Sequence, residues 1–378
     1  MSHTRRDTIA GALSLAAASL ASERATAGNG ERSPWQGRRY RRWEIGPLAG
    51  PRGLRLVERR AQAPGPGQVL VEMRAAALNH RDLMIVAGRY GRPQPPERVP
   101  LSDGAGVVVA VGPGVTDVAV GDRVTAPHFL EWLDGDYDPA IFAADLGNTA
   151  DGWLSELVTL PAQSLLTLPD GLDFSDAAAL GAAGITAWTV LVNLGRIKAG
   201  DTVLTLGTGG VSILALQIAK MFGAKVAITS SSNDKLDLAR RLGADITVNY
   251  RERPDWEVAV REANDGHGVD IVVETVGVAT LGRSLACCAP NARIGLLGAL
   301  GGQAQEPPDL MPMLLGNLLL KGITSGSRRM FADLLRACGL NGVKPHIDRR
   351  FDFDEARAAW EYLAGGGHVG KLIVSRGA

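Results

Sequence analysis

Asp201-Thr202-Val203-Leu204-Thr205-Leu206-Gly207-Thr208-Gly209-Gly210-Val211-Ser212 is the stretch that decides the fold of this 378-residue chain. A short apolar strand runs into a glycine turn, and the apolar spacing of residues 213–219 predicts a helix after it. Gly207 allows the sharp turn, and Gly209 and Gly210 leave room where a pyrophosphate approaches the backbone. The first N–H groups of the helix would hold that phosphate. Ser212 replaces the third glycine of the usual pattern, so the prediction of a dinucleotide site depends on the order strand, turn, helix.

Strands and helices alternate after this turn. The sequence predicts apolar strands at residues 203–206, 225–229, 246–249, 269–275 and 293–297, with helices at 211–222 and 235–242. Near-continuous apolar strands separated by helices are typical of a parallel sheet that is covered on both faces. The expected fold class is therefore α/β, with a doubly wound, Rossmann-type parallel sheet.

The composition excludes several classes of protein. Lys and Arg together number 40, as do Asp and Glu, so no global basic field points to nucleic acid. Cys287, Cys288 and Cys338 form no CxxC pair, which argues against a disulfide framework and a cysteine zinc site. We expect the adjacent Cys287 and Cys288 to be small buried apolar side chains near the end of a helix. Beyond the N-terminus there is no run of about twenty apolar residues, so no membrane-spanning segment is expected in the body of the protein.

Residues 1–37 have the pattern of an export leader. Arg5 and Arg6 precede an apolar run over residues 9–21, and residues 25–27 are small enough for a cleavage site. The run is too short to span a bilayer, and paired arginines ahead of it are typical of a twin-arginine signal. We therefore expect a periplasmic protein, with a cytoplasmic protein that carries an N-terminal extension as the alternative.

Short motifs flank the glycine turn on both sides. They are Asn79-His80-Arg81-Asp82, Ser102-Asp103-Gly104-Ala105-Gly106, Gly121-Asp122-Arg123-Val124, Ala179-Leu180-Gly181-Ala182-Ala183-Gly184-Ile185-Thr186-Ala187-Trp188 and Gly370-Lys371-Leu372-Ile373-Val374. In this order they resemble the medium-chain dehydrogenase/reductase superfamily. The resemblance implies a Rossmann-type cofactor domain (165–320) inserted into a GroES-like, partly open β-barrel domain (38–164 and 321–378). It also implies a homodimer.

The chain departs from the zinc alcohol dehydrogenases of that superfamily. By the resemblance, their zinc ligands (a cysteine, a histidine and a second cysteine) are replaced by Asn79, Ser102 and Ala182, with Asp103 at the neighbouring glutamate position. One carboxylate cannot hold a four-coordinate zinc, and residues 128–160 contain no cysteine for a structural zinc lobe. We therefore predict a metal-free enzyme, similar to the zinc-independent branch that includes NADPH-dependent quinone and enone reductases.

The end of the second strand in the cofactor domain favours NADPH. An NAD site usually places an acidic residue there to bind the ribose 2′-OH, whereas this chain has Ser230 and Ser231, whose hydroxyls can donate to a 2′-phosphate. Lys235 and Tyr250 resemble the NADPH clamp of the quinone reductases. Asp234 could instead be an acidic ribose ligand, so NADH is the alternative.

The predicted site contains two candidate catalytic side chains, Asn79 and His80, with a solvated or hydrogen-bonded loop histidine as the alternative for His80. Without zinc, the oxyanion that develops during reduction must be stabilised by hydrogen bonds. The other cofactor-binding candidates are Thr186, Gly207, Thr208, Gly209, Gly210, Val211, Val276, Gly298, Ala299 and Arg328. Arg328 could reach a phosphate or be solvated, Lys371 is assigned to a structural turn with cofactor contact as the alternative, and His128 is assigned to a loop without a catalytic role.

The resemblance implies hydride transfer from NADPH to a quinone or to the β-carbon of an α,β-unsaturated carbonyl. A metal-free alcohol or aldehyde oxidoreductase and a non-catalytic NADPH-binding protein are the alternatives, because a phosphate-binding glycine turn suits all three. We expect a small-molecule substrate in the cleft between the two domains.

Overall fold

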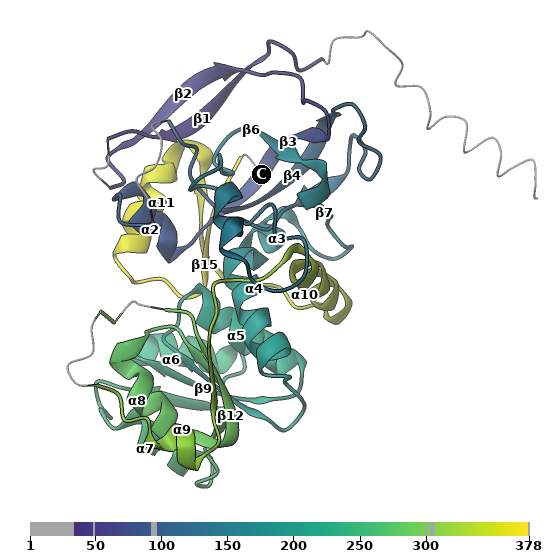
Figure 1. Cartoon of the computed structure of the whole chain (residues 1–378). Coiled ribbons are helices and arrows are strands. Elements are labelled where there is room, and N and C mark those ends of the chain that lie inside the picture. Colours follow the sequence, from purple (N-terminus) through teal and green to yellow (C-terminus); the bar gives the residue numbers. More distant parts are fainter. Residues whose placement is uncertain (1–33, 48–49, 92–96, 299–300, 303–306, 377–378) are drawn as a thin grey trace, which may run out of the picture.

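The computed structural model describes residues 34–47, 50–91, 97–298, 301–302 and 307–376. Figure 1 shows two lobes, with the labelled strands β9 and β12 in one and β3, β4 and β15 in the other. The predicted leader arginines, Arg5 and Arg6, and the predicted cofactor ligand Ala299 lie outside the described residues.

The cofactor lobe holds a six-stranded parallel sheet with the order β10-β9-β8-β11-β12-β13. Its strands are β8 (Thr202–Leu206), β9 (Lys225–Ser230), β10 (Ile246–Asn249), β11 (Val269–Glu274), β12 (Cys288–Leu296) and β13 (Leu319–Gly322). Helices α5 (Gly210–Met221), α6 (Asn233–Arg241), α7 (Trp256–Ala263), α8 (Val278–Ala286) and α9 (Met311–Leu315) connect them. In chain order the sheet reads 3-2-1-4-5-6, which is the doubly wound dinucleotide-binding order and confirms the predicted α/β class.

Strand β8 is central in this sheet, and all five of its residues are buried. Val203 belongs to the hydrophobic cluster that contains Ile213 and Leu214 of α5. Its neighbour Leu204 belongs to a second cluster, with Trp256 of α7. Successive side chains point to opposite faces of a strand, so helices on both faces explain why the strand is apolar throughout.

The barrel lobe is organised around a second sheet with the order β14-β15-β3-β4-β5-β7, in which β6 also pairs with β3. Its strands are β3 (Gln68–Leu78), β4 (Asp103–Val111), β5 (Arg123–Thr125), β6 (Leu157–Pro161), β7 (Leu166–Thr167), β14 (Ile347–Asp352) and β15 (Lys371–Ser375). Its helices include α2 (His80–Val86), α3 (Phe174–Leu180) and α11 (Ala356–Ala364). Because β15 pairs with β3, the end of the chain completes a sheet that begins before the cofactor lobe.

One boundary differs from the sequence prediction. The pattern predicts a helix beginning at Phe351, whereas this residue lies in β14 and the helix α11 begins at Ala356. Phe351 is buried and pairs with Val374 of β15, and Asp352 then caps a short 3-10 turn by accepting from the Asp354 N–H. Pairing with β15 therefore holds residues that were predicted to be helical in a strand.

Two helices join the lobes. After α3, Gly181 leads into α4 (Ala182–Trp188), which continues as a π-helical segment over Thr189–Leu194. Within the part of the chain that the structure describes, no single helix has the length and apolar character to cross a membrane. The bent pair α3 and Ala182–Leu194 meets that criterion jointly, and its alanines at 177–179 are fully buried in the protein core.

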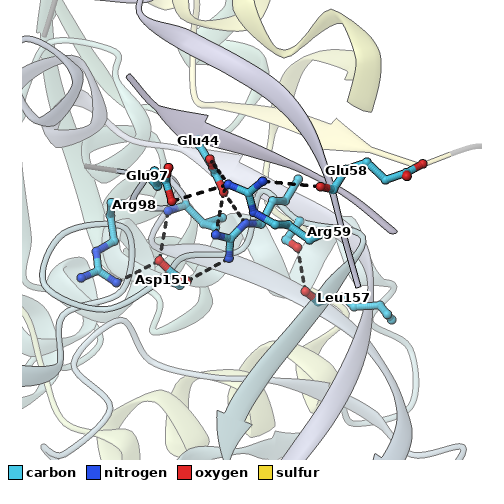
Figure 2. Close-up of polar contacts among 10 residues, drawn as sticks. Glu44, Glu58, Arg59, Glu97, Arg98, Asp151 and Leu157 are labelled. Carbon is cyan, nitrogen blue, oxygen red and sulfur yellow. Dashed lines mark hydrogen bonds and ion pairs between the residues drawn. The ribbon is translucent and has the colours of Figure 1, made fainter. Parts of the chain in front are cut away.

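A β-hairpin of β1 (Arg39–Ile45) and β2 (Leu54–Arg60) is fastened to the barrel lobe by a chain of ion pairs (Figure 2). Glu44 is only 4% exposed and binds Arg42 at 2.6 Å and Arg59 at 2.7 Å. Arg42 also reaches Asp151, which binds Arg98 at 2.8 Å. The buried Glu44 carboxylate is thus compensated by two guanidinium groups, as a buried charge requires.

Candidate active site

A cavity of about 560 Å³ lies between the two lobes. From the barrel lobe it is lined by Leu78, Asn79, His80, Arg81, Met84, Tyr90, His128, Leu363, His368, Gly370, Lys371 and Leu372. From the cofactor lobe and the helices that join the lobes it is lined by Ala182, Ala183, Thr186, Leu206, Gly207, Gly209, Gly210, Val211, Ser212, Thr275, Val276, Leu297, Gly298 and Thr324. The predicted catalytic and phosphate-binding residues therefore face one space.

The glycine turn forms the cofactor wall of this cavity from backbone. Gly207 has a φ of +72°, which favours glycine, and a side chain on Gly209 would meet nothing within 4 Å. The first helical hydrogen bond runs from the Ile213 N–H to the Gly209 carbonyl, so the N–H groups ahead of it are donors for an anion. The open space at Gly209 and these donors fit the pyrophosphate of a dinucleotide.

Ser212, the departure from the usual fingerprint, has a structural role here. Its hydroxyl donates to the Leu206 carbonyl at 2.6 Å, which ties the start of α5 to the end of β8. The third glycine normally allows close packing between helix and strand. A small side chain with a hydrogen bond achieves the same contact, so the imperfect motif is compatible with the fold.

Residues that follow β11 and β12 complete the cofactor wall. Thr275, Val276 and Gly298 line the cavity there, and a Cβ on Gly298 would lie 1.5 Å from the Thr275 carbonyl oxygen. The buried Glu274 accepts the N–H groups of Val276 and Gly277, each at 3.0 Å. Its carboxylate therefore holds the turn in shape and presents the neighbouring backbone to the cavity.

The predicted NADPH clamp is only partly assembled. Ser230 and Tyr250 lie at the ends of the adjacent strands β9 and β10, and the Tyr250 N–H donates to the Ser230 carbonyl at 3.0 Å. Lys235, in the first turn of α6, donates instead to the carbonyl of Gly366 at 2.6 Å. None of these residues, nor Ser231, is among the residues that line the cavity.

The opposite wall of the cavity is made from side chains. Asn79 precedes α2, and its amide nitrogen donates to Asp103 of β4 at 2.7 Å. Lys371 of β15 donates to the Asn79 amide oxygen at 2.6 Å, and the other Asp103 oxygen accepts the Ala182 N–H at 2.9 Å. Residues far apart in sequence thus form one hydrogen-bonded group.

Two members of this group, Asn79 and Ala182, were matched to zinc ligands in the sequence, and a third, Asp103, was matched to the neighbouring glutamate. Asn79 and Ala182 both contact Asp103, while Lys371 places an ammonium 3.5 Å from its carboxylate. An ammonium only donates hydrogen bonds and repels a divalent cation, so these residues do not fit a zinc ion. Over the described ranges no cluster of three or more His, Cys, Asp or Glu side chains is arranged to hold a metal.

Burial shifts the proton affinity of the groups around Asn79. Asp82 accepts the backbone N–H of Asn79 at 2.7 Å and is fully buried, which raises the pKa of its carboxyl to about 7 despite the nearby Arg81. Burial lowers the pKa of Lys371, and Asp103 opposes that shift. Burial also lowers the pKa of His80 and, far more strongly, that of His128. Near neutral pH these two rings are therefore uncharged.

The far end of the cavity is aromatic and basic. The Arg81 guanidinium lies 4.7 Å from the centre of the Tyr90 ring and pairs with the buried Asp145 at 2.5 Å. Burial raises the pKa of Tyr90, so its hydroxyl stays protonated and can donate. His128 lines this end too, although the sequence assigned it no role.

Among the other predicted cofactor ligands, Thr186 and Val211 line the cavity, whereas Thr208 and Arg328 do not. Thr186 lines it, and its hydroxyl is bound to the Ala182 carbonyl at 2.7 Å. Thr208 contributes its carbonyl, which accepts the Gly370 N–H at 3.0 Å. Arg328 is not brought to the cavity, because its guanidinium donates to the Leu165 carbonyl at 2.6 Å and joins two segments of the protein.

Sequence reasoning missed Tyr90 and underestimated Lys371 and His128. Lys371 carried one usable signal, since a charged residue begins the apolar strand Leu372–Val374 and must find partners if it is buried. The structure shows that it is 2% exposed. Tyr90 and His128 gave no such signal, because only the folded loops bring them to the cavity. Cys287 and Cys288 are buried, as predicted, and Cys338 is buried as well.

Comparisons with known proteins agree with this architecture. Residues 65–170 match the alcohol dehydrogenase GroES-like domain, and residues 210–338 match the family described as zinc-binding dehydrogenase. A zinc-type alcohol dehydrogenase-like protein of Schizosaccharomyces pombe is 38% identical over 322 residues, which cover 83% of this chain and 92% of that protein. The chain belongs to the medium-chain dehydrogenase/reductase superfamily, and it is an oxidoreductase with the GroES-like and Rossmann-type domains of that superfamily.

Solved structures give the same result. A structure of an NAD-dependent alcohol dehydrogenase is 33% identical, with a TM-score of 0.81, over 89% of this chain and 100% of the other. A mycobacterial quinone oxidoreductase is 29% identical, with a TM-score of 0.73, over 89% of this chain and 99% of the other. Proteins of this fold therefore include both alcohol dehydrogenases and quinone reductases.

Proposed function

We propose that the protein is a zinc-independent, NADPH-dependent reductase of quinones or α,β-unsaturated carbonyl compounds. One observation carries the proposal: Asn79 and Ala182, which the resemblance matches to zinc-ligand positions, both hydrogen-bond to Asp103, and the Lys371 ammonium lies beside them, where it would repel a metal ion. The glycine turn lines the same cavity and offers a binding site for the pyrophosphate of a dinucleotide.

When bound, the reduced nicotinamide supplies a hydride to an electron-poor carbon of the substrate, and negative charge develops on the carbonyl oxygen. A conjugated carbonyl or quinone suits this chemistry, since its acceptor carbon is already activated without a Lewis acid. The Asn79 amide N–H is placed to stabilise the oxyanion by a hydrogen bond. The apolar lining from Met84, Leu363 and Leu372 suits an apolar substrate body.

A proton must then reach the reduced substrate. Tyr90 lines the cavity with a hydroxyl that is protonated at neutral pH, so it can donate to the substrate or relay a proton from solvent. His80, which is exposed at the start of α2 and lines the cavity, is the second candidate. Because the pKa of His80 is lowered, it would act as a neutral hydrogen-bond donor near pH 7 and not as an imidazolium.

NADPH is proposed over NADH because of the residues at the end of β9 and directly after it. Ser230 and Ser231 follow the pattern of a 2′-phosphate site, where a carboxylate would repel the ligand. Lys235 would have to exchange its hydrogen bond with the Gly366 carbonyl for a phosphate oxygen. That exchange would strengthen the bond, because a hydrogen bond between two charged groups is stronger than one to a neutral carbonyl.

Alcohol or aldehyde interconversion is the second candidate, and it is favoured by the alcohol dehydrogenases among the similar proteins. A saturated carbonyl is a weaker hydride acceptor, so this reaction would rely more heavily on Asn79 to polarise the carbonyl. The two functions share one cavity and differ in the substrate that reacts.

The test is a substrate panel with purified full-length protein. NADPH oxidation would be followed at fixed concentration with 9,10-phenanthrenequinone, with 2-cyclohexenone and with a simple aldehyde, and the panel would be repeated with NADH. We expect turnover with the quinone or the enone and faster turnover with NADPH. Turnover with the aldehyde alone would favour the second candidate, while dinucleotide binding without turnover on any substrate would indicate a binding protein.

A homodimer is proposed on the exposed apolar edge of the cofactor lobe. Leu314 and Leu315 of α9 are 74% and 79% exposed, and Leu319 of the edge strand β13 is 50% exposed. Apolar side chains grouped at a sheet edge are typical of a contact between protein chains. Light scattering coupled to size-exclusion chromatography measures the mass directly, and a monomeric mass would contradict this proposal.

A further inference from the structure

Lys371 is a buried lysine whose hydrogen-bonding capacity is satisfied by its neighbours. Its ammonium donates to the Leu78 carbonyl at 2.9 Å and to the Asn79 amide oxygen at 2.6 Å, and it lies 3.5 Å from an Asp103 carboxylate oxygen. An ammonium has three protons, and three acceptors surround it. A cation is therefore held against the side chain that faces the substrate.

The chemistry of these partners fixes which way the Asn79 amide points. The Lys371 ammonium can only donate, so the amide atom beside it must be the oxygen. The Asp103 carboxylate can only accept, so the nitrogen must face it, and their separation is 2.7 Å. One amide N–H and one lone pair are then left for the cavity that Asn79 lines.

The other end of Lys371 lies against the dinucleotide turn. Its side-chain Cδ would be 2.9 Å from a Cβ built on Gly210. The preceding residue, Gly370, donates to the Thr208 carbonyl at 3.0 Å and forms a β-bridge with Gly209. One residue thus contacts the predicted seat of the pyrophosphate with its stem and the predicted oxyanion donor with its ammonium.

We propose that Lys371 is a positioning residue, which orients the Asn79 amide so that an N–H faces the substrate oxygen and sets that orientation relative to the cofactor turn. The proposal rests on the proposed function, in which Asn79 stabilises the oxyanion. A rotated amide would present its oxygen to the oxyanion and repel it, so the same residue would oppose the reaction.

A double-mutant cycle separates positioning from a structural role. Lys371→Met removes the ammonium and keeps the stem, and its effect on kcat is measured in the wild-type and in the Asn79→Ala background with the substrate that the panel identifies. We expect kcat to fall by about 10- to 100-fold in the wild type and by less than about threefold in the Asn79→Ala background, since no amide remains to be oriented. Lys225→Met, which alters an exposed lysine at the start of β9, is the control.

Equal losses of kcat in the two backgrounds would overturn the proposal, because they would mean that Lys371 acts independently of Asn79. Lys371→Met leaves the Asp103 carboxylate buried without its cation, which can prevent folding. Lys371→Met combined with Asp103→Asn removes both charges and allows the same comparison with Asn79→Ala. The dinucleotide Kd is measured in parallel and is expected to change little.

A crystallographic readout does not depend on turnover. In the Lys371→Met and Asp103→Asn double variant, at a resolution that distinguishes the amide nitrogen from the oxygen, we expect the Asn79 amide to flip, rotate or occupy two conformers, whereas an unchanged amide would overturn the proposal. Absence of turnover in the wild-type protein would contradict the proposed function, and the crystallographic comparison would still decide the role of Lys371.

Discussion

The two walls of the cavity are built in opposite ways. The main part of the cofactor wall is one continuous segment from β8 to α5, which offers backbone N–H groups and open space at Gly209 to the dinucleotide that we propose binds there. The substrate wall is a set of side chains, Asn79, Asp103 and Lys371, that come from three strands or helices far apart in the sequence. The first is fixed by local conformation, whereas the second exists only when the whole barrel lobe has formed.

The largest effect is expected for Asp82, which supports the substrate wall. Burial raises the pKa of its carboxyl from 3.8 to about 7, so the folded state prefers the protonated acid. As far as Asp82 is concerned, the free energy of unfolding of the wild type is therefore highest below pH 3.8. It falls as the pH rises to about 7 and does not change further above that pH. At 1.36 kcal/mol for each pKa unit the loss is about 4 kcal/mol.

Asp82→Asn removes this titration, so the variant should gain stability relative to the wild type between pH 4.5 and pH 7.5. Denaturant unfolding at the two pH values measures the difference, and Asp136→Asn, at an exposed position, is the control. A difference between variant and wild type that does not change with pH would show that Asp82 is ionised in the folded protein.

Asn79→Ala tests the substrate wall itself. Loss of one oxyanion donor typically lowers kcat by about 100- to 1,000-fold, and we expect a fall in this range with an unchanged dinucleotide Kd. Steady-state kinetics with the best substrate of the panel gives kcat, and Asn341→Ala on an exposed helix end is the control. A fall of only a few fold would place the oxyanion elsewhere, with Tyr90 as the next residue to replace.

Lys235→Ala tests whether cofactor choice depends on α6, outside the residues that line the cavity. We expect NADPH to bind more weakly by about 1.5–3 kcal/mol, the value of a hydrogen bond to a charged group, with a much smaller effect on NADH. Titration of each dinucleotide by fluorescence or calorimetry measures the two Kd values. Equal weakening of both would indicate that Lys235 acts only through its hydrogen bond to the Gly366 carbonyl.

Gly209→Ala should show the smallest effect on binding. It changes only the glycine turn where we propose that the pyrophosphate binds. A methyl group on Gly209 meets no protein atom within 4 Å, so Tm should not change. The methyl would occupy space that a pyrophosphate needs, and the dinucleotide Kd should rise about tenfold, or about 1.4 kcal/mol. Gly367→Ala, also in open space, is the matched control, and an unaltered Kd would argue against a phosphate at this turn.

The same contrast explains what the sequence predicted. Strand β8, the turn at Gly207 and the alternation of strands and helices were predictable, because they follow from local hydrophobic periodicity and glycine conformation. The barrel lobe and the replacement of the zinc ligands were predicted through the resemblance to the superfamily. The true start of α11 at Ala356 was not predictable, since pairing between β14 and β15 is a long-range contact.

Two residues of the substrate wall were identified from the sequence, but the hydrogen bonds that join its residues were not. Asn79 and Asp103 were identified through the zinc positions, yet nothing in the sequence linked them to Lys371, 268 residues after Asp103. Arg328 shows the converse, because a basic residue near the cofactor strands was a reasonable phosphate ligand until the fold placed it against the Leu165 carbonyl. Side-chain hydrogen bonds across a fold carry no local sequence signal.

The most direct test of whether the substrate wall works without a metal is to compare turnover before and after removal of metal ions. Purified full-length protein would be dialysed against a strong chelator, its zinc content measured by mass spectrometry, and kcat determined with NADPH and the best substrate of the panel. We predict that zinc is substoichiometric and that kcat is unchanged by the chelator. Loss of kcat on chelation, restored by stoichiometric Zn²⁺, would contradict the assignment of a metal-free site to Asn79, Asp103 and Lys371.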